Sequence, residues 1–240
     1  LATTLAAATG VDMGRSDWEY IYRLRVQGYG TGMVIRAGAQ GTTNAVMYGS
    51  ALLGCGTALR LEGLNGVGLS VTACQLGGTH GLATTDRFTT VAQFNSCQIS
   101  SIDHTGRGVL TLQHCTVDGA ANAERGTLSA LDCDLGPVKL GVDVPRARLL
   151  GCRWKGQPAV DNQSKGDIAI AHRDLKLSRP NLAMHVPAPV MRPVSDRLYL
   201  VTEHGADVKA DDNTTAFQKA LDTAGAAGGG TAYVPAGRYN

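Results

Sequence analysis

The spacing of the six cysteines constrains the fold more than any other feature of the sequence. They recur about every 20 residues, at Cys55, Cys74, Cys97, Cys115, Cys133 and Cys152. Each of the last five lies three residues after one apolar residue and two residues before another. No Cys-x-x-Cys pair occurs, so a zinc site or a redox motif is disfavoured. A repeat of this length is typical of a solenoid.

The flanks of the cysteines indicate which kind of solenoid forms. In a strand, a residue and the one two positions later share a face, so each cysteine and its apolar neighbour predict an inward column. We therefore expect an all-β, right-handed parallel β-helix, a single-stranded solenoid of about eight coils between about Asp17 and Leu177. Leucine-rich repeats have a similar period, but their Leu-x-x-Leu-x-Leu frame is absent. The stacked thiols are expected to be buried and free, because parallel side chains on adjacent strands have the wrong dihedral for a disulfide.

Composition agrees with many short strands and turns. Glycine contributes 31 of 240 residues, aromatic residues are only 5%, and the 43% of hydrophobic residues is enough for a core. A net charge of +2 does not favour nucleic acid as a partner. No apolar run reaches the roughly 18 residues of a membrane span. The segment Leu1–Gly10 is small and apolar, but no basic segment precedes it, so it is not interpreted as a signal peptide.

Three regions are predicted along the chain. Residues 1–178 form the C-terminal part of a first β-helix, with strands that include Trp18–Val26, Ala45–Tyr48 and Val109–Leu112. Residues 179–196 hold four of the eight prolines and predict a linker. Residues 197–240 predict a strand over Arg197–Thr202, a helix over Asp212–Ala224 and a strand over Thr231–Val234. The apolar stripe of that helix is expected to cover a coil end, and its members are Ala216, Phe217, Ala220, Leu221 and Ala224.

The third region carries a resemblance to a known family. His204-Gly205-Ala206, Asp212–Leu221 and Gly229–Tyr239 together resemble the opening motif of pectate-lyase-superfamily β-helices. One departure is that Asp207–Asp211 replaces the usual Gly-Asp-Gly. The resemblance implies a capping helix and the first strand of a second β-helix. Because the motif follows a set of coils and a linker, the order resembles the tandem β-helices of glycoside hydrolase family 55, the β-1,3-glucanases. Phage tailspike depolymerases use the same opening motif.

Candidate site residues follow from the repeat. If cysteine points inward, the residues on either side of it point outward, which predicts an exposed polar ladder. Asp132 and Asp134 flank Cys133 about 6.5–7 Å apart along a strand, near the lower end of the carboxylate separation in inverting glycosidases, about 6.5–9.5 Å. They are candidate catalytic groups together with His114, one coil away. A solvated polar face without catalysis is the alternative. The candidate substrate-binding residues are Gln98, Thr116, Arg153 and Trp154.

Other kinds of binding site have weaker support in the sequence. Trp18, Tyr20 and Trp154 could stack on sugars, although single aromatic residues at strand ends more often pack. The spacing of the histidines assembles no metal cluster, and Gly228–Gly230 follows a helix rather than preceding one, so no cofactor is predicted.

Two functions remain open. The first is a fragment of an extracellular or cell-surface polysaccharide-acting protein, a glycoside hydrolase or a polysaccharide lyase whose catalytic groups lie mostly outside this chain. The second is a non-catalytic carbohydrate-binding or structural β-helix, tailspike-like or a surface adhesin. Both imply a polysaccharide as substrate or ligand.

Overall fold

The computed structural model describes residues 2–15, 18–39, 41–156, 159–171 and 197–240. The chain forms two compact units, Leu1–Leu182 and Ala183–Asn240. The predicted linker, 179–196, and the predicted ends of the coil region, Asp17 and Leu177, lie outside the described residues.

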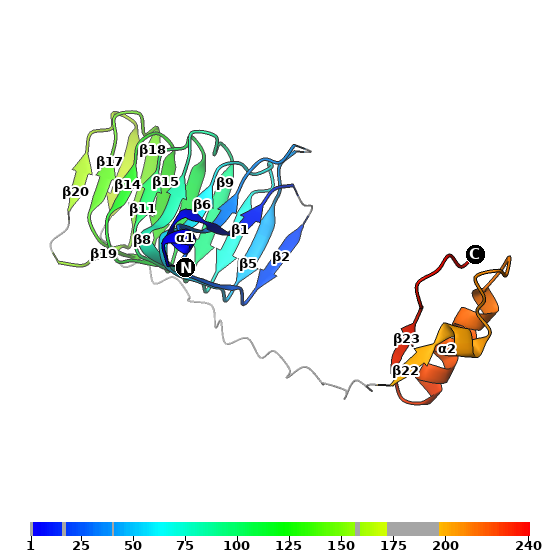
Figure 1. Cartoon of the computed structure of the whole chain (residues 1–240). Coiled ribbons are helices and arrows are strands. Elements are labelled where there is room, and N and C mark those ends of the chain that lie inside the picture. The colour runs from blue at the N-terminus through cyan, green and yellow to red at the C-terminus, as the bar shows by residue number, and fades with distance from the viewer. Residues whose placement is uncertain (1, 16–17, 40, 157–158, 172–196) are drawn as a thin grey trace. The chain divides into compact units, whose positions relative to one another are not determined.

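The first unit is an all-β parallel β-solenoid of about seven turns, where about eight were expected (Figure 1). Every pair of named strands within it is parallel. One sheet has eight strands, in the spatial order β2 (Glu19–Tyr22), β5 (Ala45–Tyr48), β7 (Leu69–Thr72), β9 (Val91–Asn95), β12 (Val109–Gln113), β15 (Thr127–Leu131), β18 (Arg146–Leu150) and β21 (Asp167–Ala171).

The second sheet of this unit has thirteen strands. It branches after β8 into two rows, one through β10 to β19 and one through β11 to β20, so each later coil has three faces. Its strands are β1 (Thr9–Met13), β3 (Arg25–Gln27), β4 (Thr31–Ile35), β6 (Ala51–Leu61), β8 (Gln75–Thr84), β10 (Gln98–Ile99), β11 (Ile102–His104), β13 (Thr116–Val117), β14 (Ala121–Ala123), β16 (Asp134–Leu135), β17 (Val138–Leu140), β19 (Arg153–Trp154) and β20 (Val160–Asn162).

A short helix that the sequence did not predict, α1 (Ala2–Ala7), lies against the first coil. The Leu5 carbonyl accepts hydrogen bonds from the backbone N–H groups of Ala8 and Gly30, at 3.0 and 2.8 Å. A Cβ on Gly30 would lie 2.1 Å from the Ala6 carbonyl oxygen, so only glycine allows this contact.

The prediction of an internal cysteine column is confirmed. All five predicted thiols are buried and free, and we call them the thiol column: Cys74, Cys97, Cys115, Cys133 and Cys152. Each Sγ donates to the carbonyl two residues earlier, and the N–H groups of Cys97 and Cys115 each donate to the Sγ of the next coil at 3.4 Å. Ser50 holds the same position one coil before Cys74. Cys55, in contrast, lies off this column in β6, opposite Gly78.

The thiol column does not lie within strands, as the sequence suggested, but at a corner between the two sheets. Cys115, for example, lies between the end of β12 at Gln113 and the start of β13 at Thr116. The residue before each column position has a left-handed backbone with φ between 49° and 65°: Arg23, Gly49, Ala73, Ser96, His114, Asp132 and Gly151. This conformation turns the chain from one sheet to the other. The turn at Arg23 divides the predicted strand Trp18–Val26 into β2 and β3. The strand predicted over Ala45–Tyr48 has the predicted bounds.

The second unit contains β22 (Leu198–Leu200), the 3-10 helix η1 (Val201–His204), α2 (Thr214–Ala226) and β23 (Thr231–Tyr233). β22 and β23 pair in parallel, so the predicted strand–helix–strand order is confirmed, with the helix shifted by two residues. Its buried face consists of Ala216, Ala220 and Ala224, whose small side chains let the helix approach the strands.

The predicted apolar stripe of α2 is partly wrong. Leu221 is 55% exposed, because it lies beside, and not on, the buried row of residues at every fourth position that includes Ala220. Phe217 is half-buried and packs edge-to-face against Tyr239, with ring centroids 5.8 Å apart.

Candidate functional site

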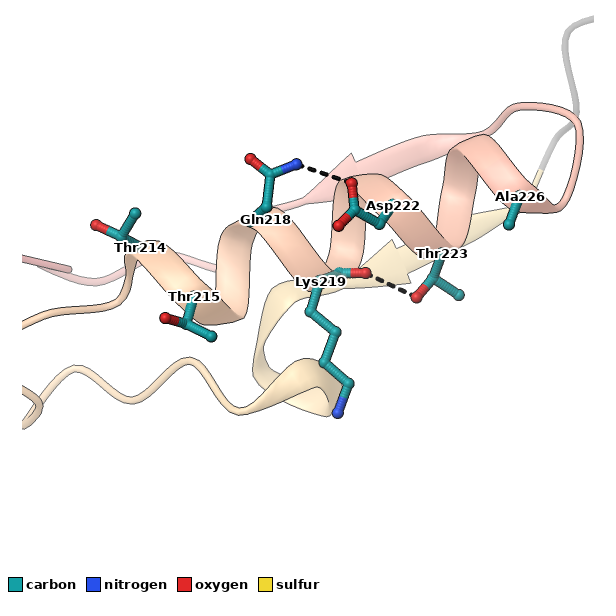
Figure 2. Close-up of a pocket in the computed structure, with 7 residues that line it drawn as sticks. All are labelled: Thr214, Thr215, Gln218, Lys219, Asp222, Thr223 and Ala226. Atoms are coloured by element: carbon teal, nitrogen blue, oxygen red, sulfur yellow. Dashed lines mark hydrogen bonds between the residues drawn. The ribbon is translucent and has the colours of Figure 1, made fainter.

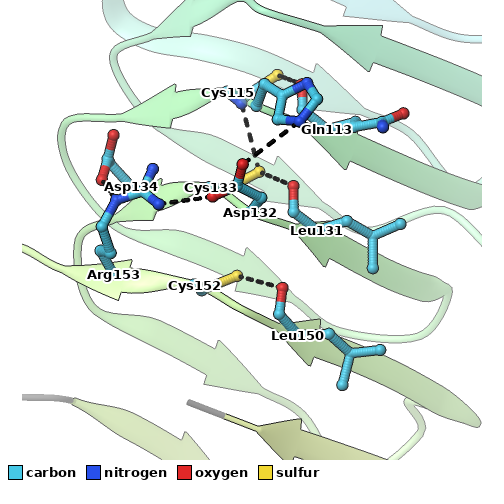
Figure 3. A network of polar contacts seen from close by, with 10 residues as sticks. Gln113, Cys115, Leu131, Asp132, Cys133, Asp134, Leu150, Cys152 and Arg153 are labelled. Carbon is cyan, nitrogen blue, oxygen red and sulfur yellow. Dashed lines mark hydrogen bonds and ion pairs between the residues drawn. The ribbon is translucent and has the colours of Figure 1, made fainter. Parts of the chain in front are cut away.

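The structure brings four predicted site residues together in a group that we call the corner cluster: His114, Asp132, Asp134 and Arg153. Figure 3 shows Arg153 beside Asp132 and Asp134. Arg153 Nη1 donates to Asp132 Oδ1 and Arg153 Nε donates to Asp134 Oδ1, both at 2.6 Å. His114 Nε2 lies 3.4 Å from Asp132 Oδ2. The left-handed corner positions His114 and Asp132, because each directly precedes a thiol-column residue.

The electrostatics of the corner cluster favour a structural role over acid–base catalysis. Hydrogen bonds to Asp134 and Asp132 raise the pKa of the Arg153 guanidinium above its usual value. Arg153 lies between the two carboxylates and hydrogen-bonds to both. Hydrolysis instead requires one protonated carboxyl and room for water between the pair. The Asp132 side chain is only 13% exposed and that of His114 is buried, so the predicted exposed ladder before cysteine is wrong at these two residues.

The predicted ladder after cysteine is confirmed. Gln98, Thr116, Asp134 and Arg153 are register neighbours on four successive strands, and their side chains are exposed or half-exposed. Gln98 lines a hollow of about 180 Å³ together with Gln75, Ser100 and Asp118.

Trp154 lies differently from the other predicted binding residues. It is in register with the buried Leu135 and packs against the core. It therefore closes the interior of a coil rather than presenting a ring to a ligand.

A second surface, which sequence analysis missed as a whole, covers the outer side of the first six strands of the eight-stranded sheet and ends before β18, where Arg146 and Arg148 face outward. These six strands are β2, β5, β7, β9, β12 and β15, and none of their outward-facing residues is charged. The charged residue of β2, Glu19, is in register with the buried Ala45. We call this surface the neutral face; its residues are Tyr20, Tyr22, Val46, Tyr48, Ser70, Thr72, Val91, Gln93, Asn95, Val109, Thr111, Gln113, Thr127, Ser129 and Leu131.

Aromatic rings gather at the β2 end of the neutral face. Tyr20 is 73% exposed and Trp18, just before β2, is 59% exposed. Tyr22 and Tyr48 stack with centroids 6.1 Å apart, and the Arg23 guanidinium lies 5.1 Å from the Tyr22 centroid. Alternation within Glu19–Tyr22 could have indicated that both tyrosines face outward. From the sequence alone, Trp18 and Tyr20 were interpreted only as single, separate aromatic residues.

A polar groove follows the outer side of β11, β14, β17 and β20. Two hollows of about 370 and 260 Å³ share Asn122 and Lys139. Asp103 pairs with His80 Nδ1 and accepts a hydrogen bond from Asn122 Nδ2 at 3.0 Å. Lys139 lies beside Asp161 in the larger hollow. Both signs of charge are therefore present, and several of the polar side chains already bind one another.

A further hollow, of about 740 Å³, lies along α2 in the second unit (Figure 2). Its described lining comes from one side of a single helix, and most of these residues carry a polar group on an otherwise apolar side chain. Gln218 donates to Asp222 at 2.8 Å, and the Thr223 hydroxyl donates to the Lys219 carbonyl at 2.7 Å. These contacts lie within the helix, and a single helix face with no opposite wall defines no ligand site.

The described part of the chain offers neither a metal site nor a membrane-spanning helix. No group of three or more His, Cys, Asp or Glu side chains is arranged to hold a metal ion. No described helix is long and apolar enough to cross a membrane.

Fold and surface together define a parallel β-solenoid in which six strands of one sheet form an uncharged outer surface with aromatic rings at its β2 end. No family model, no curated protein and no solved structure matches this chain. The similarity to the pectate-lyase superfamily therefore remains an interpretation of the motif in residues 197–240.

Proposed function

We propose that this chain is a non-catalytic β-helix that binds a neutral polysaccharide along the neutral face. The observation that carries the proposal is the combination of exposed aromatic rings with uncharged amide and hydroxyl side chains on six consecutive strands. The C–H faces of sugar rings pack on aromatic rings, and their hydroxyl groups hydrogen-bond to amides and hydroxyls.

The dimensions of the neutral face suit a polymer. Six strands spaced about 4.8 Å apart extend over roughly 24 Å, longer than a single sugar. Uncharged lining disfavours nucleic acid, which is bound through its phosphates by Lys and Arg. The motif in residues 197–240 supports the same ligand class, since it resembles β-helices that act on polysaccharides, and with it an extracellular or cell-surface location.

Hydrolysis by Asp132 and Asp134 has less support. The Arg153 guanidinium binds both carboxylates at 2.6 Å and so occupies the space between them, where an inverting glycosidase holds the attacking water. We therefore assign the chain to carbohydrate binding within a polysaccharide-acting protein rather than to glycoside hydrolysis.

Affinity electrophoresis in gels that contain a soluble β-glucan or glucomannan tests the proposal. Tyr20→Ala should weaken the affinity, measured as retardation, by about two- to twelvefold, because one stacking ring contributes about 0.5–1.5 kcal/mol. Tyr233→Ala, which removes another exposed strand tyrosine, serves as the matched control and should leave binding unchanged. Equal retardation of wild type and Tyr20→Ala, or no retardation of wild type, would refute the proposal. Release of reducing sugar by wild type, lost in Asp134→Asn, would instead favour the hydrolase.

A further inference from the structure

A small apolar hollow lies at the edge of the neutral face, where β2, β5, β7 and β9 begin. Its volume is about 110 Å³. The side chains of Trp18, Val46, Val67 and Val91 contribute its apolar lining, and we call it the valine hollow. Trp18, Val46 and Val67 are exposed, so the hollow opens to solvent.

Backbone contacts hold the walls of the valine hollow in place. Asn44 Oδ1 accepts the N–H of Trp18 at 3.0 Å, and Asn65 Oδ1 accepts the N–H of Val67 at 3.0 Å. Gly68 has a φ of +84°, and a Cβ there would lie 2.3 Å from the Val91 carbonyl oxygen. Only glycine therefore lets the loop that carries Val67 lie directly against β9.

The rim of the valine hollow is polar and uncharged. Val46, Ser70 and Gln93 are register neighbours on β5, β7 and β9. The Ser70 hydroxyl and the Gln93 amide can each donate a hydrogen bond to a carbonyl oxygen. None of the residues that line the hollow is charged, so a carboxylate or an ammonium group would lose its hydration there without gaining a partner.

Size restricts the occupant further. About 110 Å³ is room for roughly three or four water-sized groups, which is too little for a sugar ring. An acetyl group, with one methyl, one carbonyl carbon and one carbonyl oxygen, fits both the volume and the polar rim.

We propose that the valine hollow binds an O-acetyl substituent of the neutral polysaccharide. Tyr20 is in register with Val46, so a sugar stacked on the Tyr20 ring lies about one strand spacing, roughly 4.8 Å, from the hollow. The acetyl methyl packs among the three valines while the Ser70 and Gln93 side chains bind its carbonyl oxygen. This inference rests on the proposed function, and it adds a preference for acetylated over unsubstituted chains.

The experiment compares an O-acetylated glucomannan with the same polymer after mild alkaline deacetylation. Wild type should bind the acetylated polymer about fourfold more tightly, the gain expected from burying one methyl group. Val67→Ser should reduce this ratio to about one with unchanged affinity for the deacetylated polymer, because Val67 lies outside the neutral face. Val46→Ser should independently reduce the ratio to about one. Val142→Ser is the matched control, since Val142 is 66% exposed, close to the 58% of Val67, and lies outside the hollow.

The outcomes separate this inference from the function on which it rests. Equal affinity of wild type for both polymers, or a ratio that survives both valine substitutions, overturns the acetyl site and leaves polysaccharide binding intact. Failure of wild type to bind either polymer overturns both. Loss of the ratio in Val142→Ser as well would show that the effect does not arise in the hollow, which also overturns the inference.

Discussion

His104 shows how a single buried side chain makes the stability of the solenoid depend on pH. It is fully buried, its Nε2 donates to the Gly108 carbonyl at 3.1 Å, and its Nδ1 accepts from the Thr84 hydroxyl at 2.8 Å. Burial disfavours the imidazolium and lowers the pKa of His104 to about 4, from 6.5 in an exposed position.

The free energy of unfolding should therefore fall as the pH is lowered. The unfolded chain takes up a proton at His104 near pH 6.5 and the folded chain only near pH 4, so the stabilisation is complete above 6.5 and declines towards 4. Between pH 7 and pH 4, wild type should lose about 3 kcal/mol more than His104→Gln, measured by urea unfolding. His80→Gln, at an exposed position, should retain the wild-type loss. Identical pH profiles for wild type and His104→Gln would contradict this account.

Arg153 gives a second prediction at the scale of one residue. Arg153→Gln leaves Asp132 and Asp134 without the cation between them and should lower the free energy of unfolding by about 1–2 kcal/mol. The control, Arg146→Gln, removes an exposed pair with a 3.7 Å separation from Asp167, and should change stability by less than about 0.5 kcal/mol. Chemical denaturation measures both. Equal losses would mean that the corner cluster contributes no more than an ordinary surface pair.

At the scale of elements, the recurring feature is the left-handed corner between the sheets. Its seven described positions include one alanine, one serine, one histidine and one aspartate, although glycine adopts this backbone most readily. The corner is therefore imposed by the pairing of the strands on either side of it rather than by local preference.

Neighbouring corner positions should respond to substitution with opposite signs. Gly49→Ala adds left-handed strain, and its Cβ meets only Arg23 Cγ at 3.7 Å, so a loss of about 0.5–1 kcal/mol is expected from the backbone alone. Ala73→Gly removes the same left-handed strain from the folded state, but glycine also makes the unfolded chain more flexible, which lowers stability. The net effect should be neutral or stabilising by about 0.5 kcal/mol. Thermal unfolding of the two variants provides the comparison. A destabilising Ala73→Gly would show that φ does not govern this position.

These corners explain what the sequence could and could not predict. Spacing and flanking residues identified the thiol column and its burial, because the packing of a solenoid interior repeats with every coil. The same pattern placed His114 and Asp132 on an exposed strand, because nothing in Gln113-His114-Cys115 signals a left-handed turn without glycine. The neutral face escaped notice because outward positions in six separate strands become one surface only when the coils are stacked.

At the scale of the whole molecule, the six thiols report on the integrity of the stack. All of them are free and buried. Hydrogen bonds between neighbouring thiols raise the pKa values of Cys97 and Cys133 but lower that of Cys115. Burial, which keeps a reagent away from every sulfur, therefore decides their reactivity.

Native protein should therefore be inert to Ellman's reagent at neutral pH, whereas six thiols should react after unfolding in denaturant. Val142→Cys supplies the positive control, since a thiol at that exposed position should react at once without denaturant. Rapid labelling of one or more thiols in native wild type would show that the coils open locally.

The equal spacing of Cys97, Cys115 and Cys133 has a consequence for how such a chain can change length. Each pair is 18 residues apart and holds the same corner position. Excision of residues 97–114 would join Ser96 to Cys115 through the same turn and place Ala92 of β9 opposite Leu128 of β15, two residues already in register with Leu110 between them. The excision would remove one 18-residue coil, and the aromatic end of the neutral face would be unchanged. The reach of this surface along a polymer can thus be reset in whole-module steps, by deletion or duplication of 54 nucleotides, without redesign of the core.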